Sequence, residues 1–334
     1  MGPPSRTGTP TETAKAIPRG GGALGHLKAG FSLIKAAAKE WSDDNAPRLG
    51  AALAYYTLFS LAPMLIVAIA VAGAVFGDEA ARGQIVGQLQ GLVGVDGGHA
   101  IQAMLESARK PTSGVIATVV GLAAFLFGAT GAFAELQGAL NTVWNVIPKP
   151  GRGIKGVIRD RLLSFGMVLA IGFLLLVSLV LSAGLAALGK VMGGFMPGWV
   201  VLGQILNIAV SFGVVTLLFA MIYKVLPDVR LAWSDVLIGA AFTSLLFTVG
   251  KLAIGLYLGK STTASAYGAA GSLVVLLVWV YYSSQILLFG AEFTQVYADR
   301  YGSHVRPASN AIEAPKAKID RNEAQRIAKE AAQA

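Results

Sequence analysis

The sequence contains no cysteine among its 334 residues. Disulfide bonds and thiolate chemistry are therefore excluded, whether as a covalent scaffold, a metal centre or a nucleophile. Charged residues are also scarce, because they make up 13% of the chain, whereas roughly 25% is usual for a soluble domain. With 54% hydrophobic residues and a mean hydropathy of +0.63, the composition is that of a membrane protein.

Histidine and clustered acids, the groups that most hydrolytic enzymes use, are rare as well. The three histidines are His26, His99 and His304, which lie far apart in the sequence, and no HExxH, paired-histidine or DxD pattern occurs. Asp43 and Asp44 are adjacent, but adjacent residues on a helix diverge by about 100° and form a poor clamp for two metal ions. We therefore expect no metal site, no cofactor and no enzymatic activity.

The segment GLYLGKSTT, at residues 255–263, looks like a phosphate-binding loop but has the wrong spacing. Such a loop has four residues between its first glycine and the Gly-Lys pair, whereas three residues separate Gly255 from Gly259, and Ile254 stands where the glycine is needed. Nucleotide hydrolysis is therefore not expected. Gly255 and Gly259 instead form a small-xxx-small pair, which lets a neighbouring helix approach closely.

Six apolar segments are long enough to cross a membrane, which takes roughly 20 helical residues for ~30 Å of hydrocarbon. They cover residues 49–76, 114–133, 162–188, 199–223, 233–258 and 271–293. The sequence thus predicts an all-α, polytopic membrane domain over residues 49–298, built as a bundle of six transmembrane helices.

Lysine and arginine are distributed unevenly around these segments. Of the 27 cationic residues, 21 lie in the N-terminal segment, the second and fourth loops and the C-terminal tail, and five lie in the other three loops. Cytoplasmic segments preferentially retain such residues, so both termini are predicted to be cytoplasmic. Nucleic-acid binding is not expected, because it needs a basic patch interleaved with stacking aromatics, and these cations lie beside segment ends.

Two regions precede the first apolar segment. Residues 1–24 are polar, rich in glycine and proline, and lack the apolar core of a cleavable signal peptide, so they are predicted to be disordered. Residues 25–48 predict a cytoplasmic amphipathic helix on the inner membrane surface. Its apolar positions at helical spacing are Leu27, Phe31, Ile34, Ala38 and Trp41.

Two further regions lie outside the predicted spans. The outer loop, residues 77–113, predicts two short helices separated by the helix breaker VDGG at residues 95–98. Residues 299–334 form a basic, charged cytoplasmic tail. We expect this tail to be a flexible linker with a marginal terminal helix.

The last apolar segment carries a specific combination of motifs. The run AYGAAGSLVVLLVWVYYSSQILLFGAEFTQVYADR joins a Tyr-Gly-x-x-Gly start, a Trp-x-Tyr-Tyr centre and a Gly-Ala-Glu end, and the first segment contains RLGAALAYYTLFSLAPMLIVAIAVAG. Over about residues 36–301 the chain resembles the BrkB/YihY family of bacterial inner-membrane proteins. The resemblance implies a multi-pass inner-membrane location. Members of the family have carried ribonuclease, virulence and envelope lipid transport labels.

Polar residues within the spans are the candidate functional residues, because ionisable groups there are costly and usually face the bundle or a water-filled cavity. Lys251 lies about 10 Å from the outer end of the fifth segment at 1.5 Å per residue, and Ser244 and Thr248 share its face. The alternative is that Lys251 extends its amine to the outer surface.

Two glutamates lie near the inner boundary. Glu292 is at the inner end of the last segment, with Gln285 and Tyr281 at roughly one-turn spacings on a similar face, and Glu135 is at the inner end of the second segment. Both could face a transport pathway. The alternative is that they pair with arginines at the inner boundary, where charge is less costly.

Other positions shape the predicted bundle. Tyr56 and Ser60 interrupt the apolar first segment, and Pro63 deprives one carbonyl of its helical partner and favours a kink. Asp235 opens the fifth segment, where an acid caps a helix favourably. The glycines predicted to permit close helix packing are Gly128, Gly131, Gly138, Gly255 and Gly259.

These residues and the family resemblance together predict a translocator of a lipid or other amphiphile in envelope biogenesis, with membrane lipids as partners. The alternative is a non-transporting scaffold or assembly partner that docks envelope proteins through its outer loop and basic tail. A homo-oligomer is compatible with both. Ribonuclease activity is not expected, because the catalytic clusters it requires are absent.

Overall fold

The computed structural model describes residues 23–109, 131–149, 198–260 and 271–314, together with residues 166, 174, 177 and 184. The predicted second and third spans lie almost entirely outside these residues, as do most of segment 1–24 and the last 20 residues of the tail. The count of six spans and the location of both termini therefore stay predictions.

Three described helices are long and apolar enough to cross a membrane. They are α6 (Gly198–Val225), α7 (Trp233–Lys260) and α9 (Gly271–Tyr301). A fourth helix, α2 (Ala46–Phe76), coincides with the first predicted span and continues through Pro63. α9 is longer than its predicted span, because its 31 residues measure about 46 Å at 1.5 Å per residue. Its last turns therefore extend beyond ~30 Å of hydrocarbon.

The predicted surface helix is present but shorter than expected. α1 (Ala23–Asp43) ends before the turn at Asp44 and Asn45, and α2 begins at Ala46. Asn45 adopts a left-handed conformation with φ of 54°, which asparagine tolerates better than most residues. Pro47 follows in the first turn of α2, where its missing N–H is not needed. This turn explains why the helix does not extend to residue 48.

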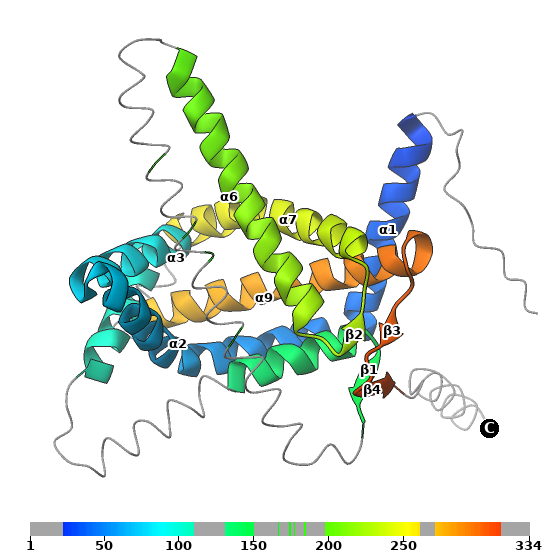
Figure 1. Ribbon diagram of the computed structural model, residues 1–334, viewed down its shortest axis with the longest axis horizontal. Coiled ribbons are helices and arrows are strands. Elements are labelled where there is room, and N and C mark those ends of the chain that lie inside the picture. The colour runs from blue at the N-terminus through cyan, green and yellow to red at the C-terminus, as the bar shows by residue number, and fades with distance from the viewer. Residues whose placement is uncertain are drawn as a thin grey trace, which may run out of the picture.

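The long helices lie side by side, with α9 in contact with both α2 and α7 (Figure 1). α3 (Asp78–Arg109) packs across one end of α2 and α9. α1 and four short strands lie at the opposite end, and α6 packs on α7. α9 is therefore the helix around which the other described elements are arranged.

The predicted break in the outer loop is replaced by a bend. α3 is helical throughout, including residues 95–98. However, a Cβ atom at Gly98 would lie 2.9 Å from Cγ of Gln90, although eight residues span about 12 Å along a straight helix. The helix must therefore turn back between these residues. Its second half buries Ile101 and Leu105 against apolar residues of α2 and α9.

The all-α prediction misses two short antiparallel sheets. β1 (Val146–Pro148) pairs with β4 (Ala311–Glu313), and β2 (Val229–Arg230) pairs with β3 (Arg306–Pro307). The backbone after α9 thus folds onto two loops that precede it by more than 75 residues. The prediction of a flexible tail from residue 299 is wrong for this part, because α9 extends to Tyr301 and both β3 and β4 follow it.

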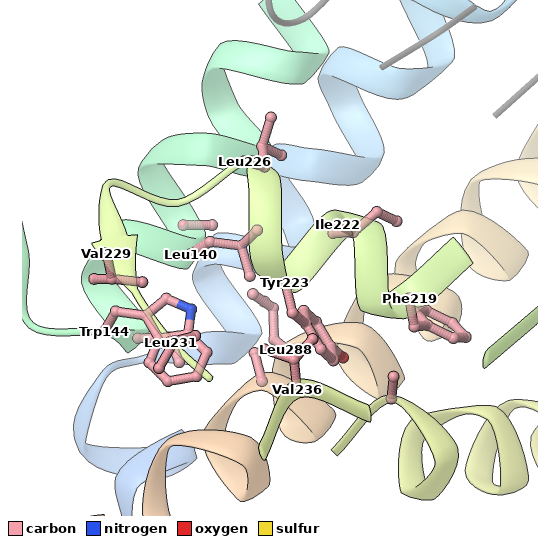
Figure 2. Packing of buried hydrophobic residues seen from close by; sticks show 14 of the residues in the cluster. Leu140, Trp144, Phe219, Ile222, Tyr223, Leu226, Val229, Leu231, Val236 and Leu288 are labelled. Atoms are coloured by element: carbon pink, nitrogen blue, oxygen red, sulfur yellow. The ribbon is translucent and has the colours of Figure 1, made fainter. Parts of the chain in front are cut away.

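The main apolar core lies between the strands and the middle of the helices (Figure 2). Trp144, at the end of a helix over residues 131–143, is almost wholly buried, and Tyr223 of α6 and Leu288 of α9 are fully buried. Val236 of α7 completes the contact (Figure 2). Relative to exposure to water, burial of each such side chain stabilises the fold by about 1.5–3 kcal/mol.

Close helix contacts occur at glycines other than most of the predicted ones. A Cβ atom at Gly290 would lie 2.6 Å from the Tyr223 hydroxyl, and one at Gly239 would lie 2.6 Å from Cβ of Thr294. A larger side chain at either glycine would therefore not fit between α9 and its neighbours α6 and α7. The short glycine contacts, all below 3.0 Å, include Gly50, Gly98, Gly239, Gly250, Gly290 and Gly302.

The predicted packing glycines differ among themselves. A Cβ atom at Gly131 would lie 3.2 Å from the Tyr56 ring, so this glycine does face α2. Added Cβ atoms at Gly138 and Gly255 would meet nothing within 4 Å, so no described element packs on these two. Gly128 lies outside the described residues, and no contact of Gly259 is described.

Replacing Gly290 or Gly239 by alanine is expected to destabilise the protein by about 1–3 kcal/mol, because the added methyl group overpacks a helix interface. Gly255→Ala is the matched control and should be neutral or stabilising by up to ~1 kcal/mol, since alanine is the better helix former. Unfolding in detergent micelles measures all three. Equal losses for Gly290→Ala and Gly255→Ala would contradict the assignment.

Candidate functional site

The C-terminal third of α9 is the most deeply buried part of the described chain. Every residue from Gly290 to Val296 is buried, which means that protein surrounds this helix on all sides over two turns. Tyr223 of α6 and Thr243 of α7 lie against Gly290, and α1 packs against Phe293. Glu292 lies within this stretch and is 0% exposed. Its place at the inner membrane boundary stays a prediction.

Gln285 lies on the same face of α9, seven residues before Glu292. Its Nε2 atom donates to the Ala46 carbonyl at 3.5 Å and packs against Gly50 at the start of α2. Its Oε1 atom is buried and has no hydrogen-bond partner in the part of the chain that the structure describes. An unsatisfied buried acceptor costs about 1–3 kcal/mol. A ligand that donates a hydrogen bond to this oxygen would remove that cost.

Hydroxyl groups connect α9 to α6 and α7 beside this site. The Tyr223 hydroxyl donates to the Leu287 carbonyl at 2.7 Å and lies 3.1 Å from Oγ1 of Thr243. Thr294 donates to the Gly290 carbonyl within its own helix at 2.6 Å. Because these hydroxyls already have hydrogen-bond partners, we assign them to helix packing. They hold the side of α9 that faces away from Gln285.

The predicted polar stripe on α7 does not reach Glu292. Ser244 donates to the Phe212 carbonyl of α6 at 3.4 Å, and Thr248 donates to the Ser244 carbonyl at 2.8 Å. Both hydroxyls are therefore engaged by backbone. Lys251 is half-buried, and its neighbour Gly250 packs on Tyr282 and Ile286 of α9. That level lies roughly 10–15 Å from Glu292 along the helix.

The remaining predicted residues differ in burial. Tyr56 and Tyr281 are exposed, Glu135 is half-buried and Ser60 is buried. Ser60 donates to the Thr57 carbonyl of its own helix at 3.1 Å. On one face of α9, the structure thus buries Glu292 and the Gln285 amide oxygen and leaves Tyr281 exposed.

Sequence reasoning missed a buried polar cluster at the strand-bearing end, formed by Asn141, Asp228 and Asn310. Asn141 Nδ2 donates to one Asp228 oxygen at 3.1 Å, and Asn310 Nδ2 donates to the other at 2.6 Å. The Asn141 Oδ1 atom accepts the Asp228 N–H at 2.8 Å. We call these three residues, with strands β1 to β4, the clasp.

The clasp joins segments that are 82 and 87 residues apart in sequence. Its acid is buried, and hydrogen bonds to a charged group contribute about 1.5–3 kcal/mol each. The tripeptide Leu-Pro-Asp at the end of α6 could have signalled a structured turn. Nothing local in the sequence indicates that its partners are Asn141 and Asn310.

Asp235 has a different role from the predicted helix cap. One of its carboxylate oxygens accepts the Ser303 N–H and the Ser303 hydroxyl, both at 2.8 Å. The Ser303 hydroxyl in turn accepts the Ala232 N–H at 3.3 Å. Asp235 therefore ties the start of α7 to the chain just beyond α9, next to the clasp.

Arg82, on α3, has a largely enclosed guanidinium. Its Nε and Nη2 atoms are buried without a hydrogen-bond partner in the described part of the chain. It lies on α3 one turn before Ile85 and Val86, which pack against α2 and α9.

No group of three or more His, Asp or Glu that could hold a metal ion occurs among the described residues.

Long apolar helices in contact at glycines, with polar side chains enclosed between them, define a helical integral membrane protein. A sequence model of the family of virulence factor BrkB matches residues 37–314. The chain therefore belongs to that family. The match ends at the residue whose N–H donates to Asn145 directly after β4, so it includes the whole clasp.

The relatives are described only as membrane proteins. The chain is 28% identical over 269 residues to the UPF0761 membrane protein of Pseudomonas paraeruginosa, covering 80% of this chain and 62% of the relative. It is 26% identical to that of Ralstonia nicotianae, covering 78% and 57%. It is 27% identical to that of Pseudoalteromonas translucida, covering 72% and 78%. The chain thus spans about six tenths of the first two relatives. No solved structure matches it.

Asp228→Ala is expected to destabilise the protein by about 2–4 kcal/mol, because it leaves the amides of the buried Asn141 and the half-buried Asn310 without their acceptor. Asp43→Ala is the control, since it breaks only the exposed Lys39–Asp43 pair, which contributes at most about 0.5 kcal/mol. Unfolding in detergent compares them. A loss of the same size in both variants would show that the clasp adds no stability.

Proposed function

We propose that this protein translocates a lipid or other amphiphile across the bacterial inner membrane in envelope biogenesis, without hydrolysing nucleotide. The observation that supports this proposal is the fully buried Glu292 in a candidate membrane span. Ionisable groups in such positions are costly and are retained mainly where substrates, ions or protons pass.

The neighbouring residues give this carboxyl group a polar route. Gln285 offers a buried amide oxygen on the same face of α9, about 10 Å away along the helix at 1.5 Å per residue. A headgroup with a donor, such as an amine or hydroxyl, could be passed between the two groups while its acyl chains stay in lipid. Energy for net transport would come from an ion gradient, a partner protein or a downhill path.

The clasp defines which end of the bundle can move. Its hydrogen bonds join the helix over residues 131–143 to the loop after α6 and to the segment after α9, and Asp235 beside it ties the start of α7 to Ser303. Nearer the middle of the bundle, the Ser244 hydroxyl of α7 donates to the Phe212 carbonyl of α6 at 3.4 Å. Beyond that bond, toward the opposite end, Ile208, Leu252 and Leu256 are exposed. We propose that access opens at that end.

The orientation of the bundle is part of the proposal. The clasp end carries Lys149, Lys224, Arg230, Arg300 and Arg306, whereas α3 at the other end carries Arg82 and Arg109. Positively charged residues are retained in the cytoplasm, so the clasp and α1 are assigned to the cytoplasmic side. α3 then covers the outer side.

The scaffold alternative loses one of its supports. It assumed that residues 77–113 form an outer loop available for docking, but α3 uses Ala100, Ile101 and Leu105 to cover apolar residues of α2 and α9. Much of this region is therefore part of the bundle. The scaffold hypothesis remains the outcome to which a failed transport experiment would lead.

Reconstituted protein is expected to accelerate translocation of fluorescent lipid analogues in liposomes, and Glu292→Gln should slow it roughly tenfold or more, as expected when a charged hydrogen bond of about 1.5–3 kcal/mol is lost. Glu106→Gln is the matched control, because Glu106 is exposed on α3 and is bonded only to Gln102 among the described residues.

Translocation is followed by chemical quenching of the outer-leaflet analogues, with lipids of several headgroup classes and with applied ion gradients. Thermal unfolding verifies that each variant is folded. Absence of flux for folded wild-type protein with every lipid class would support the scaffold hypothesis. Equal flux for Glu292→Gln and wild type would remove Glu292 from the route.

Thiol labelling tests the proposed orientation directly, because the chain has no cysteine and a single introduced one is the sole target. His99→Cys on exposed α3 should react with a membrane-impermeant maleimide in spheroplasts. Ser309→Cys, exposed in the clasp, should react only after the membrane is permeabilised. The reverse pattern would place the clasp outside.

A further inference from the structure

α1 has two distinct faces, and the predicted apolar positions are divided between them. Trp41 packs against the main apolar core, whereas Phe31, Ile34 and Ala38 are exposed. Leu33 and Ala37 are buried against Phe293 and Val296 of α9. The predicted apolar edge faces outward, with Phe31 70% exposed and Ile34 42% exposed. α1 is therefore held by one face and presents another to its surroundings.

The outward surface combines apolar and basic groups in adjacent strips. At 100° per residue, Phe31, Ile34 and Ala38 form one edge, and Lys28 and Lys35 lie beside it. All five are exposed. Arg300 adds a third cation nearby, because its Nη1 atom donates to the Ser32 hydroxyl at 3.5 Å. We call these three apolar residues and two lysines the α1 edge.

The position of α1 brings this edge to the membrane surface. α1 lies crosswise to α2 and α9 at the end that carries the strands (Figure 1). It is joined to α2 by the two-residue turn at Asp44 and Asn45. In the orientation proposed above, α2 and α9 cross the membrane, so a helix that lies across their ends is parallel to the bilayer plane.

We propose that the α1 edge binds the inner leaflet, with Phe31 and Ile34 inserted among acyl chains and Lys28 and Lys35 bound to the phosphates of anionic phospholipids. An apolar strip flanked by lysines is the arrangement by which interfacial helices bind such membranes. The proposal depends on the cytoplasmic placement of α1 proposed above, but it does not depend on translocation.

Charge and area both favour lipid over a protein partner. A stable protein interface takes about 800 Å² from each partner, and three apolar side chains on one helix edge supply only a fraction of that. An anionic leaflet needs no matching shape, and each lysine near it strengthens binding about fivefold. Because α1 is joined directly to the α2 span, it also stays close to the bilayer.

The edge is linked to the candidate site through the packed face of the same helix. Leu33 and Ala37 contact Phe293 and Val296, and Phe293 directly follows Glu292. α1 therefore contacts, through its other face, the part of α9 that carries the buried carboxyl group. The ligand class is a phospholipid with a net negative headgroup.

Site-directed spin labelling tests the proposal in the full-length protein, with nanodiscs of phosphatidylcholine alone or with added phosphatidylglycerol. A label on Ala38→Cys keeps Phe31, Ile34 and both lysines intact. It should be shielded from a water-soluble nickel relaxant and accessible to oxygen, more so with phosphatidylglycerol. A label on Ser32→Cys, which is also exposed but lies about 120° around the helix from Ala38, should stay accessible to nickel.

Charge reversal gives the sharper comparison. Adding Lys28→Glu and Lys35→Glu to the Ala38→Cys protein should weaken insertion by more than ~20-fold, since each lysine contributes about fivefold, and should remove the phosphatidylglycerol effect. Adding Phe31→Ser should reduce insertion in both lipid mixtures.

Three outcomes would overturn the proposal. Equal nickel accessibility of labels at 38 and 32 in both lipids would show that the edge stays in water. Insertion without any dependence on phosphatidylglycerol would exclude the anionic ligand. Dipolar broadening between labels in lipid-free detergent would assign the edge to a second copy of the chain. The thiol-labelling experiment separately identifies a wrong orientation.

Discussion

The enclosure of the C-terminal third of α9 is the constraint on which the other described elements depend. Seven consecutive buried residues, Gly290 to Val296, need neighbours on every side. Gly290 and Gly239 permit α6 and α7 to approach within contact distance of backbone, and α1 covers Phe293. Without a hydrophobic driving force between helices in lipid, such close contacts supply much of the attraction.

The same enclosure changes the energetics of the polar groups inside it. Glu292 and the Oε1 atom of Gln285 are buried, so their interactions are stronger than at a surface and their burial is more costly. At the strand-bearing end, the clasp offsets this cost by giving the buried Asp228 three described hydrogen bonds. The family match extends to the end of this clasp, so the clasp lies within the matched unit rather than beyond it.

The helices could be predicted because hydrophobic length is local information. The first, fourth, fifth and sixth predicted segments coincide with α2, α6, α7 and α9, with errors of a few residues at most ends. The exception is the end of α9, which continues for eight residues beyond the predicted segment because charged residues there interrupt the apolar run. Asp228, Asn141 and Asn310 could not be predicted, because each is an ordinary loop or helix-end residue until the fold brings them together. Glu292 was singled out from the sequence as a candidate, but its full burial was not foreseen.

The sequence by itself determined that the chain is a helical membrane protein of the BrkB family, because composition, apolar run length and motifs need no knowledge of distant contacts. Only the tertiary structure decided which face of α1 packs, which glycines meet a neighbouring helix, and that the residues after α9 return to form strands. Those outcomes depend on packing between segments far apart in the chain, where small differences in side-chain volume and hydrogen bonding select one arrangement.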